Sequence, residues 1–372
     1  ALRSELLARA ALGEGSRCVL GLSSGAQAID LALSLALTAP RLGGPLFDPC
    51  DSEPPPPMSV VLLRGSFHGN CTRAAFSSSA VFRAHAQRET LCEFTAIYLE
   101  PDADAAAVDA AFAAHDAGGT AIVAVVVEPQ QHFATFAQLA SPTAAALGAA
   151  AARRSVPIIC DEIWSGVHRT GSFLACTSDG LRPDMVVLAK GLCAGVAKQA
   201  ALLLRDGFDH AAILATRAAE PSAVGCAAAA ACLRAAPPEN VAARAKEVER
   251  AVGELSRAHG GRLLPVRGRG FSYEVELRAT AELAAAGWGR AASVATALAL
   301  LHALWWGGAL VLPRPLRAPR RFHCELAIDV SDDELRRLFS ALDGAAGVAA
   351  ALRLALLPFV ALASVVSAAA GL

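Results

Sequence analysis

The sequence has few charged residues and no excess of either sign. Charged residues make up 18% of the 372 positions, and 33 Lys and Arg stand against 34 Asp and Glu, for a net charge of -1. Such a balance gives no hint of a nucleic acid or an anionic membrane as a partner. Much of the 54% hydrophobic fraction is alanine, which favours closely packed helices over a core of bulky side chains.

The sequence also lacks the spacings of common metal and redox sites. Its 10 cysteines include no CxxC pair and no Cys/His cluster at zinc spacing. In a long chain this indicates small buried hydrophobes in a reducing compartment, so we expect a cytoplasmic or organelle-matrix protein. No signal peptide or tandem repeat is visible, and the first residue is Ala1 rather than Met. We therefore expect residues 1–14 to be a truncated N-terminal segment.

Apolar runs typical of buried strands recur through the first part of the chain. They occupy residues 17–20, 59–63, 120–127, 156–160, 184–188 and 200–204, and Ala-rich helical stretches at 26–37 and 141–154 lie between some of them. This alternation predicts an α/β fold with a mostly parallel central sheet and flanking helices, in a large domain at 15–235. Residues 41–57, rich in Pro, Gly and acid, indicate an exposed insertion.

The pattern changes after residue 235, and residues 236–347 predict a smaller α+β domain. A long amphipathic helix is expected from Pro237 to about His259, followed by strands in "VRGRGFSYEVEL", "GGALVLP" and "RFHCELAI". Ser331 and Glu334 form the capping box of a last helix, with Gly344 as its expected end.

An apolar tail follows at residues 348–372. From residue 354 onward it carries no charge, a length near that of a membrane span. Pro358 and the many small residues favour a packed or disordered tail over a membrane anchor.

Reactive side chains follow the expected strands. In open α/β sheets, ligands bind at the carboxyl ends of the strands. The residues found after successive apolar runs are Phe67 with His68, Glu128, Asp161 and Lys190. A lysine in this position becomes a nucleophile when it is desolvated, although a structural Lys–Asp ion pair would also explain it.

A candidate anion site lies earlier, in "GLSSGAQAIDLALSLAL", where a Ser-Gly turn opens a helix. The backbone N–H groups of Ser24, Gly25 and Ala26, with the positive end of the helix, would hold a phosphate. A phosphate cradle, a carboxylate and a lysine are together what pyridoxal 5'-phosphate requires.

The segment "IICDEIWSGVHRTGSFLACTSDGLRPDMVVLAKGL" is similar to the signature of class III aminotransferases, the ornithine/4-aminobutyrate type of PLP fold type I. Weaker similarities are "SSGAQAIDLALSLA", "GSFHGN", "VVVEP" and "VRGRGFSYEVEL", so the resemblance covers about residues 16–342. It implies a PLP-dependent transaminase that uses an amino acid or ω-amine donor and a 2-oxo acid acceptor. It also implies a homodimer.

The resemblance implies a role for each matching position around the cofactor. Lys190 would form the Schiff base and move a proton, and Asp161 would keep the pyridine nitrogen protonated. Ile163 and Phe67 would pack on the two ring faces, with His68 beside Phe67. Ser24, Gly25 and Ala26 would cradle the phosphate.

On the substrate side, the resemblance implies that Glu128 lines the pocket and that Arg321 binds a substrate carboxylate. Arg314, Arg317 and Arg320 compete for the latter role. Glu162 is expected to be structural, and His132 and His168 to lie on the surface or in loops.

Several positions depart from the family pattern. Asn70 replaces a basic residue, residues 130–133 lack the usual motif, and Trp164 stands where a polar cofactor contact is frequent. The segment "AAEPSAVG" is an eroded form of the family's cross-dimer phosphate loop, for which Thr216 or Ser222 would have to substitute. A PLP-dependent mutase, racemase or decarboxylase, or a degenerate non-catalytic domain, therefore remain alternatives.

Overall fold

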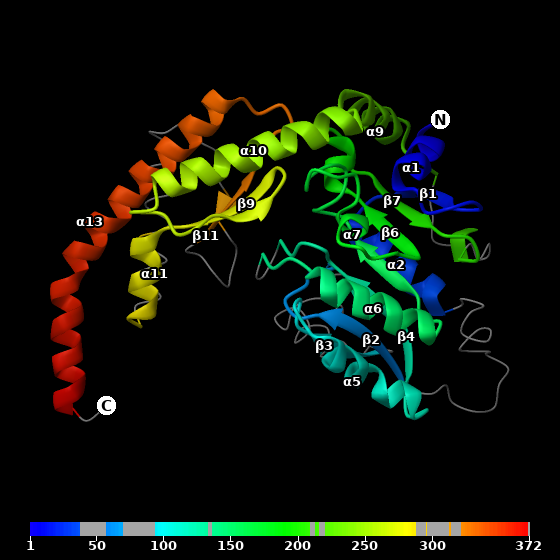
Figure 1. The fold of residues 1–372 in the computed structure, drawn as a ribbon, viewed down its shortest axis with the longest axis horizontal. Coiled ribbons are helices and arrows are strands. Elements are labelled where there is room, and N and C mark those ends of the chain that lie inside the picture. Colours follow the sequence, from blue (N-terminus) through cyan, green and yellow to red (C-terminus); the bar gives the residue numbers. More distant parts are fainter. Residues whose placement is uncertain are drawn as a thin grey trace. The chain divides into compact units, whose positions relative to one another are not determined.

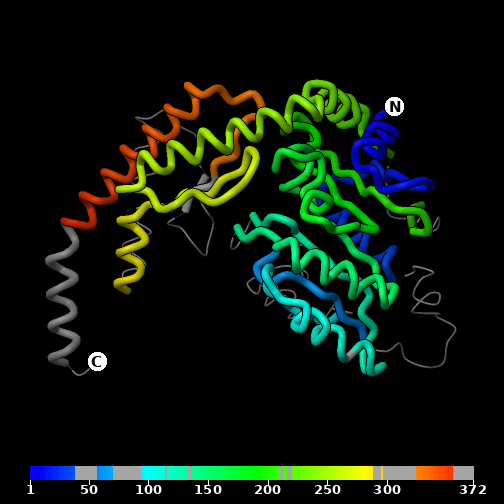
Figure 2. Tube along the Cα trace, in the orientation of Figure 1, coloured from blue at the N-terminus to red at the C-terminus, as the bar shows by residue number. Residues whose placement is uncertain are grey.

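The computed structural model describes residues 1–37, 57–69, 94–132, 136–208, 213–215, 220–287, 295, 312–313 and 321–370 (Figure 1). The side chains of residues 355–370 are not described, and Figure 2 leaves this end of the chain in grey. The expected insertion at residues 41–57 lies outside them apart from its last residue. The chain forms two compact units, Ala1–Val241 and Ala242–Leu372, which are described separately.

The first unit is built on a seven-stranded sheet with the order β1-β7-β6-β5-β4-β2-β3 (Figure 1). The sheet is parallel except that β7 runs antiparallel to both of its neighbours, β1 and β6. This confirms the predicted mostly parallel sheet. The strands are β1 (Arg17–Leu22), β2 (Met58–Leu63), β3 (Phe94–Leu99), β4 (Ala121–Val127), β5 (Ile158–Asp161), β6 (Met185–Leu188) and β7 (Ala200–Leu204).

Only β3 has no counterpart among the predicted strands of this sheet. It lies at the edge of the sheet, and its middle residues are only partly buried. The other strands were predicted from continuous apolar runs, and β3 lacks one because Thr95 and Tyr98 carry hydroxyl groups.

Helices cover both faces of the sheet, because alternate strand residues point to opposite sides. In β6, Met185 and Val187 join a core with α2, whereas Val186 and Leu188 join a core with α5 and α6. The helices of this unit are α1 (Leu2–Ala10), α2 (Gly25–Leu37), α5 (Ala105–Asp116), α6 (Ser141–Arg153), α7 (Ala175–Ser178) and α9 (Ala223–Ala235). The predicted helices at 26–37 and 141–154 are thereby confirmed.

The second unit contains a small antiparallel sheet with the order β10-β11-β9-β8. The strands are β8 (Arg267–Arg269), β9 (Ser272–Glu276), β10 (Leu312–Pro313) and β11 (Arg321–Glu325). The helices are α10 (Pro238–Ala258), which begins just before the unit, α11 (Arg278–Ala285) and α13 (Asp332–Ala370). The long helix expected after residue 236 and an α+β C-terminal unit are both present.

The last helix begins as predicted and ends elsewhere. The backbone N–H of Glu334 donates to Ser331 Oγ at 3.2 Å, and that of Ser331 donates to Glu334 Oε2 at 2.7 Å, which is the predicted capping box. The expected end at Gly344 is wrong, because α13 continues through it to Ala370 and takes in most of the tail. Gly344 costs about 1 kcal/mol in a helix, and the buried alanines that follow it outweigh this. Among the described residues, no helix is long and apolar enough to cross a membrane.

Candidate active site

The turn from β1 into α2 presents free backbone N–H groups. Ser24 Oγ accepts the N–H of Gln27 at 3.2 Å, and the Gln27 side chain accepts the N–H of Ser23 at 2.9 Å. Among the described residues, no acceptor takes the N–H groups of Ser24, Gly25 and Ala26. These donors and the positive end of α2 form a site that favours an anion.

Gly25 allows α2 to approach the segment after β5. A Cβ atom built on Gly25 would lie 2.2 Å from Ile163 Cδ1 and 2.7 Å from Ile163 Cγ1, closer than any real contact. Ile163 is buried, with 8% of its surface exposed, so its side chain has little room to move. A side chain at residue 25 would therefore displace Ile163 or the helix.

Asp161, the last residue of β5, is held through both carboxylate oxygens. Oδ1 accepts the backbone N–H of Ile163 at 3.0 Å, and Oδ2 lies 2.7 Å from His68 Nδ1. Both side chains are buried. An ionised carboxylate only accepts hydrogen bonds, so His68 Nδ1 is the donor. The pair fixes the segment after β2 to the end of β5.

Glu162 faces the other way, as strand alternation predicts. Its carboxylate accepts hydrogen bonds from the Ser165 hydroxyl and, at 2.7 Å, from the Cys176 N–H at the start of α7. With 1% of its surface exposed, it fastens its own loop. The expectation that Glu162 is structural is confirmed.

Glu128, directly after β4, joins two neighbouring segments. Its Oε2 accepts the N–H of Phe67 at 3.0 Å, and its Oε1 accepts the N–H of His132 at 3.1 Å. Burial, and then the charge of Asp161, raise the pKa of Glu128 to about 7. The two N–H donors offset part of this effect, since they stabilise the ionised form.

Lys190 leaves β6 and begins a short 3-10 helix, η3 (Lys190–Cys193), with a φ of 38°. Its Nζ lies 4.1 Å from the centroid of the Trp164 ring, which is a cation–π contact. Trp164 in turn stacks on His132, with centroids 5.1 Å apart and planes inclined by 9°. His132 and His168 lie in irregular segments between strands, as expected of loop residues, but each is only 1% exposed, so neither lies on the surface.

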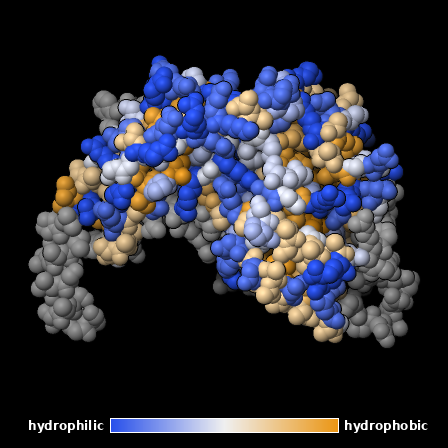
Figure 3. Space-filling view, viewed as in Figure 1, coloured by the Kyte–Doolittle hydropathy of each residue, from blue (hydrophilic) through white to orange (hydrophobic). Residues whose placement is uncertain are grey.

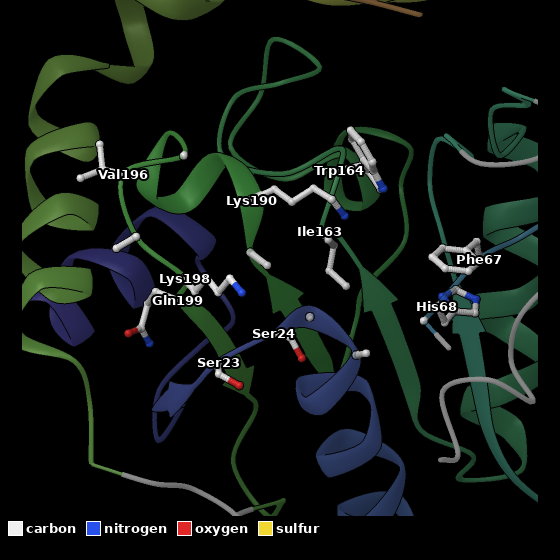
Figure 4. A pocket seen from close by; sticks show the side chains of 16 residues that line it. Ser23, Ser24, Phe67, His68, Ile163, Trp164, Lys190, Val196, Lys198 and Gln199 are labelled. Atoms are coloured by element: carbon white, nitrogen blue, oxygen red, sulfur yellow. The ribbon is translucent and has the colours of Figure 1, made fainter. Parts of the chain in front are cut away.

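These elements surround a cavity of about 760 Å³ (Figure 4), within the range of small-molecule sites. The residues predicted from sequence that line it are Ser24, Gly25, Ala26, Phe67, His68, Ile163 and Lys190. Asp161 is connected to the wall through His68, and Glu128 is connected through Phe67. Trp164, expected beside the cofactor, also lines it, and the lining residues that sequence reasoning did not place here include Ser23, Val196, Lys198 and Gln199. Lys198 stands two positions before an apolar strand, a place that a search at the carboxyl ends of strands does not include.

Other expected site residues are not among the described residues that line this cavity. The backbone of Arg321 is in the second unit, where it pairs with Glu276 of β9, and its side chain is not among those described. Ser222 caps α9, its Oγ accepting the Gly225 N–H at 3.1 Å. The positions that lie outside the described residues are Asn70, Phe133, Thr216, Arg314, Arg317 and Arg320.

Residues 2–301 match the family described as aminotransferase class-III. The chain is 33% identical over 167 residues to the 4-aminobutyrate aminotransferase of Mycobacterium leprae, an alignment covering 43% of this chain and 37% of that protein. It is 37% identical over 134 residues to the acetylornithine aminotransferase of Mycobacterium bovis, covering 34% of this chain and 32% of that protein. These alignments span only about a third of the relatives' own lengths.

Solved structures share the fold. The ornithine aminotransferase of Toxoplasma gondii, described with partial occupancy of PLP at its active site, matches with a TM-score of 0.71 and 21% identity. That match covers 91% of this chain and 74% of the other. The N-acetylornithine aminotransferase of Stenotrophomonas maltophilia matches with a TM-score of 0.65 and 23% identity, over 92% of this chain and 78% of the other. The first unit and the small antiparallel sheet thus form a fold-type-I architecture, and the chain belongs to the class-III aminotransferase family.

Proposed function

We propose that this chain binds pyridoxal 5'-phosphate and transfers an amino group from an amino acid or ω-amine to a 2-oxo acid. One observation carries the proposal: Lys190 opens into the same cavity as the unsatisfied N–H groups at the start of α2. Membership of a family of PLP-dependent aminotransferases supports it.

The residues around the cavity fit the cofactor. The N–H groups of Ser24, Gly25 and Ala26 would take its phosphate, at a place where any side chain on residue 25 would intrude. Asp161, held by His68 and by the Ile163 N–H, would pair with the pyridine nitrogen. Phe67 and Ile163 offer apolar side chains for the ring.

The chain's own groups would then act on the amino donor. When bound, the cofactor supplies a ring that withdraws electrons from the carbon losing a proton. Lys190 Nζ would take that proton from the substrate carbon and deliver it to the adjacent carbon of the cofactor. While Nζ is protonated, the face of Trp164 would hold it at the cavity wall. Asp161 would hold a proton on the ring nitrogen. Two hydrogen bonds, with His68 and with the Ile163 N–H, keep the Asp161 carboxylate in place.

The substrate contacts follow from the same family resemblance. Arg321 stays the proposed ligand of a substrate carboxylate. Glu128 is proposed to serve the substrate side indirectly, since both of its oxygens hold the segments that carry Phe67 and His132. Donors to test first are 4-aminobutyrate, ornithine and acetylornithine, the compounds named for the relatives.

We further propose that the chain forms a homodimer near this cavity. Val196, on the cavity wall, is 72% exposed, and Val224 at the start of α9 is 65% exposed. The two segments are joined by a hydrogen bond from Cys193 Sγ to the Gly225 carbonyl at 3.4 Å. Burying both valines against a second copy would remove apolar surface from water. Light scattering on the purified chain, compared with a Val196→Asp variant, would measure this.

The function is tested by adding pyridoxal 5'-phosphate to the purified chain. We expect a visible absorption band that is absent in Lys190→Ala, and borohydride reduction should fix the cofactor on Lys190, as read by mass spectrometry. Amino donors should then yield product only with a 2-oxo acid acceptor. A band without acceptor-dependent product would indicate a mutase, racemase or decarboxylase. Absence of any band would leave a non-catalytic domain.

A further inference from the structure

Lysine is rare in this chain, and its placement is uneven. The sequence contains three lysines, Lys190, Lys198 and Lys246, with arginine providing the other basic residues. Lys190 and Lys198 both line the 760 Å³ cavity, whereas Lys246 lies exposed on α10. Lys190 has a role in the proposed function, and Lys198 has none.

The fold places Lys198 beside the start of α2. β7 runs antiparallel to β1, and the register pairs Ala200 with Leu22, so the residues before Ala200 lie next to those after Leu22. Lys198 is thereby brought to the Ser23–Ser24 turn, which lines the same cavity. Figure 4 shows its side chain directed toward the open centre of the cavity.

The backbone that carries Lys198 is anchored. Gln199, next to it, is 5% exposed, and its amide donates to the Ala200 carbonyl at 2.8 Å. β7 itself is buried throughout. The ammonium of Lys198 thus extends from a fixed point.

Lys198 has a charge that nothing in the described part of the chain neutralises. It makes no hydrogen bond or ion pair with a described residue. Among the described residues that line the cavity none is a carboxylate, and Lys190 is the other lysine. A cationic cavity wall of this kind would attract a strongly anionic group.

We propose that Lys198 is the cationic partner of the cofactor phosphate, completing the site begun by the N–H groups of Ser24, Gly25 and Ala26. The inference rests on the proposed function. A phosphate dianion held by backbone amides alone keeps most of its charge, and a lysine binds phosphate as a point charge. Lys198 therefore binds the phosphate rather than a substrate carboxylate or the aldehyde.

The experiment measures the phosphate contribution without the aldehyde. Calorimetric titration compares pyridoxine 5'-phosphate with pyridoxine, neither of which can react with a lysine. The proteins are the wild-type chain, Lys198→Gln, the charge-retaining Lys198→Arg, and Lys246→Gln as the matched control. We expect Lys198→Gln to weaken binding of the phosphorylated ligand at least about tenfold, the size of a charged hydrogen bond, and to leave pyridoxine binding unchanged. Lys198→Arg should restore most of the affinity, and Lys246→Gln should resemble the wild type.

Three results would overturn the inference. One is an undiminished preference of Lys198→Gln for the phosphorylated ligand. Another is an equal loss for both ligands with an unchanged melting temperature. The third is recovery of the reduced pyridoxyl group on Lys198 instead of Lys190. If the wild-type chain forms the Lys190 adduct and yet one of the first two results is seen, the inference fails and the proposed function stands. The third result overturns both the inference and the proposed role of Lys190. If the wild-type chain binds no form of the cofactor, both fail.

Discussion

The Lys190 ammonium lies 4.1 Å from the centre of the Trp164 ring, and His132 stacks in parallel on the same indole. His132 thus supports one side of the Trp164 ring, and the ring also makes a cation–π contact with Lys190. Trp164 therefore presents an aromatic face to the amine that we propose reacts with the cofactor.

Trp164 should report on cofactor binding. It is one of four tryptophans in the chain and lines the cavity, so a bound chromophore would quench its emission most strongly. We expect pyridoxal 5'-phosphate to quench the wild-type fluorescence and to quench Trp164→Phe by a smaller fraction. Absorbance titration would establish that both proteins are equally loaded. Equal quenching at equal loading would contradict the placement of Trp164.

Gly25→Ala should disturb the cavity out of proportion to one methyl group. The added Cβ meets Ile163 at 2.2 Å, and relieving the overlap costs about 1–3 kcal/mol in stability or moves the start of α2. We expect weaker cofactor binding and a lower melting temperature, read by absorbance titration and calorimetry.

Two further variants test whether the effect comes from the contact with Ile163 or from replacing any helical glycine by alanine. Gly148→Ala lies in α6, where the new Cβ would meet, among the described residues, only Leu181 Cδ1 at 3.8 Å, so it should be neutral or stabilising. Because Ile163→Ala removes the clashing atoms as well as a proposed contact with the ring, the loss of binding in the double variant should be smaller than the sum of the losses in Gly25→Ala and Ile163→Ala. Additive losses would show that the contact with Ile163 is not the cause.

Substitutions of the neighbouring carboxylates Asp161 and Glu162 should have different effects: the first should lower turnover, and the second should lower stability. Asp161→Asn keeps an acceptor for the Ile163 N–H and loses the charge, so turnover in the loaded enzyme should fall by about 100-fold or more. Glu162→Gln presents an amide to the donors of Ser165 and Cys176 and should cost about 1–3 kcal/mol of unfolding free energy. Its turnover per bound cofactor should stay close to the wild type. Equal losses of turnover in both variants would refute this division.

His168 should make the fold sensitive to acid. Burial, and then the charge of Arg9, lower the pKa of His168 from 6.5 to about 4. Arg9 donates toward His168 Nε2 at 3.2 Å, which requires a neutral ring. Below pH 6.5 the unfolded chain takes up a proton that the folded chain refuses, so stability is lost between about pH 6.5 and 4. The loss amounts to about 3 kcal/mol.

The comparison variant for this effect is His168→Gln, whose amide oxygen can still accept from Arg9 and does not titrate. Urea unfolding at pH 7 and pH 4.5 should show a smaller acid loss in the variant than in the wild type. Glu128 acts in the opposite sense, because its raised pKa lowers stability as pH rises toward 7. Taking the difference between the two proteins cancels that contribution. Parallel pH profiles would contradict the assignment to His168.

The sequence reasoning predicted the strands that have continuous apolar runs and the side chains that follow them. Lys190, Asp161 and His68 were found because parallel strands bring their carboxyl ends to one edge. Lys198 was not, because β7 is antiparallel and brings its beginning to that edge instead. The direction of a strand depends on pairing between distant segments, which no local pattern records.

Other differences have the same origin in tertiary packing. His132 and His168 are polar in sequence, and ring contacts with Trp164 and Phe173 bury them. Gly344 has the local signature of a helix end, and burial of the alanines beside it carries α13 onward.

The reversal of direction between β6 and β7 places both lysines of the cavity on one connection. Lys190 stands at its beginning and Lys198 near its end, and only this loop separates two adjacent hydrogen-bonded strands. The proposed covalent bond to Lys190 and the proposed ionic contact with Lys198 would therefore both depend on the position of this one loop. A ligand, a partner or a deletion that displaces this loop would therefore weaken the contacts of Lys190 and Lys198 with the cofactor at the same time.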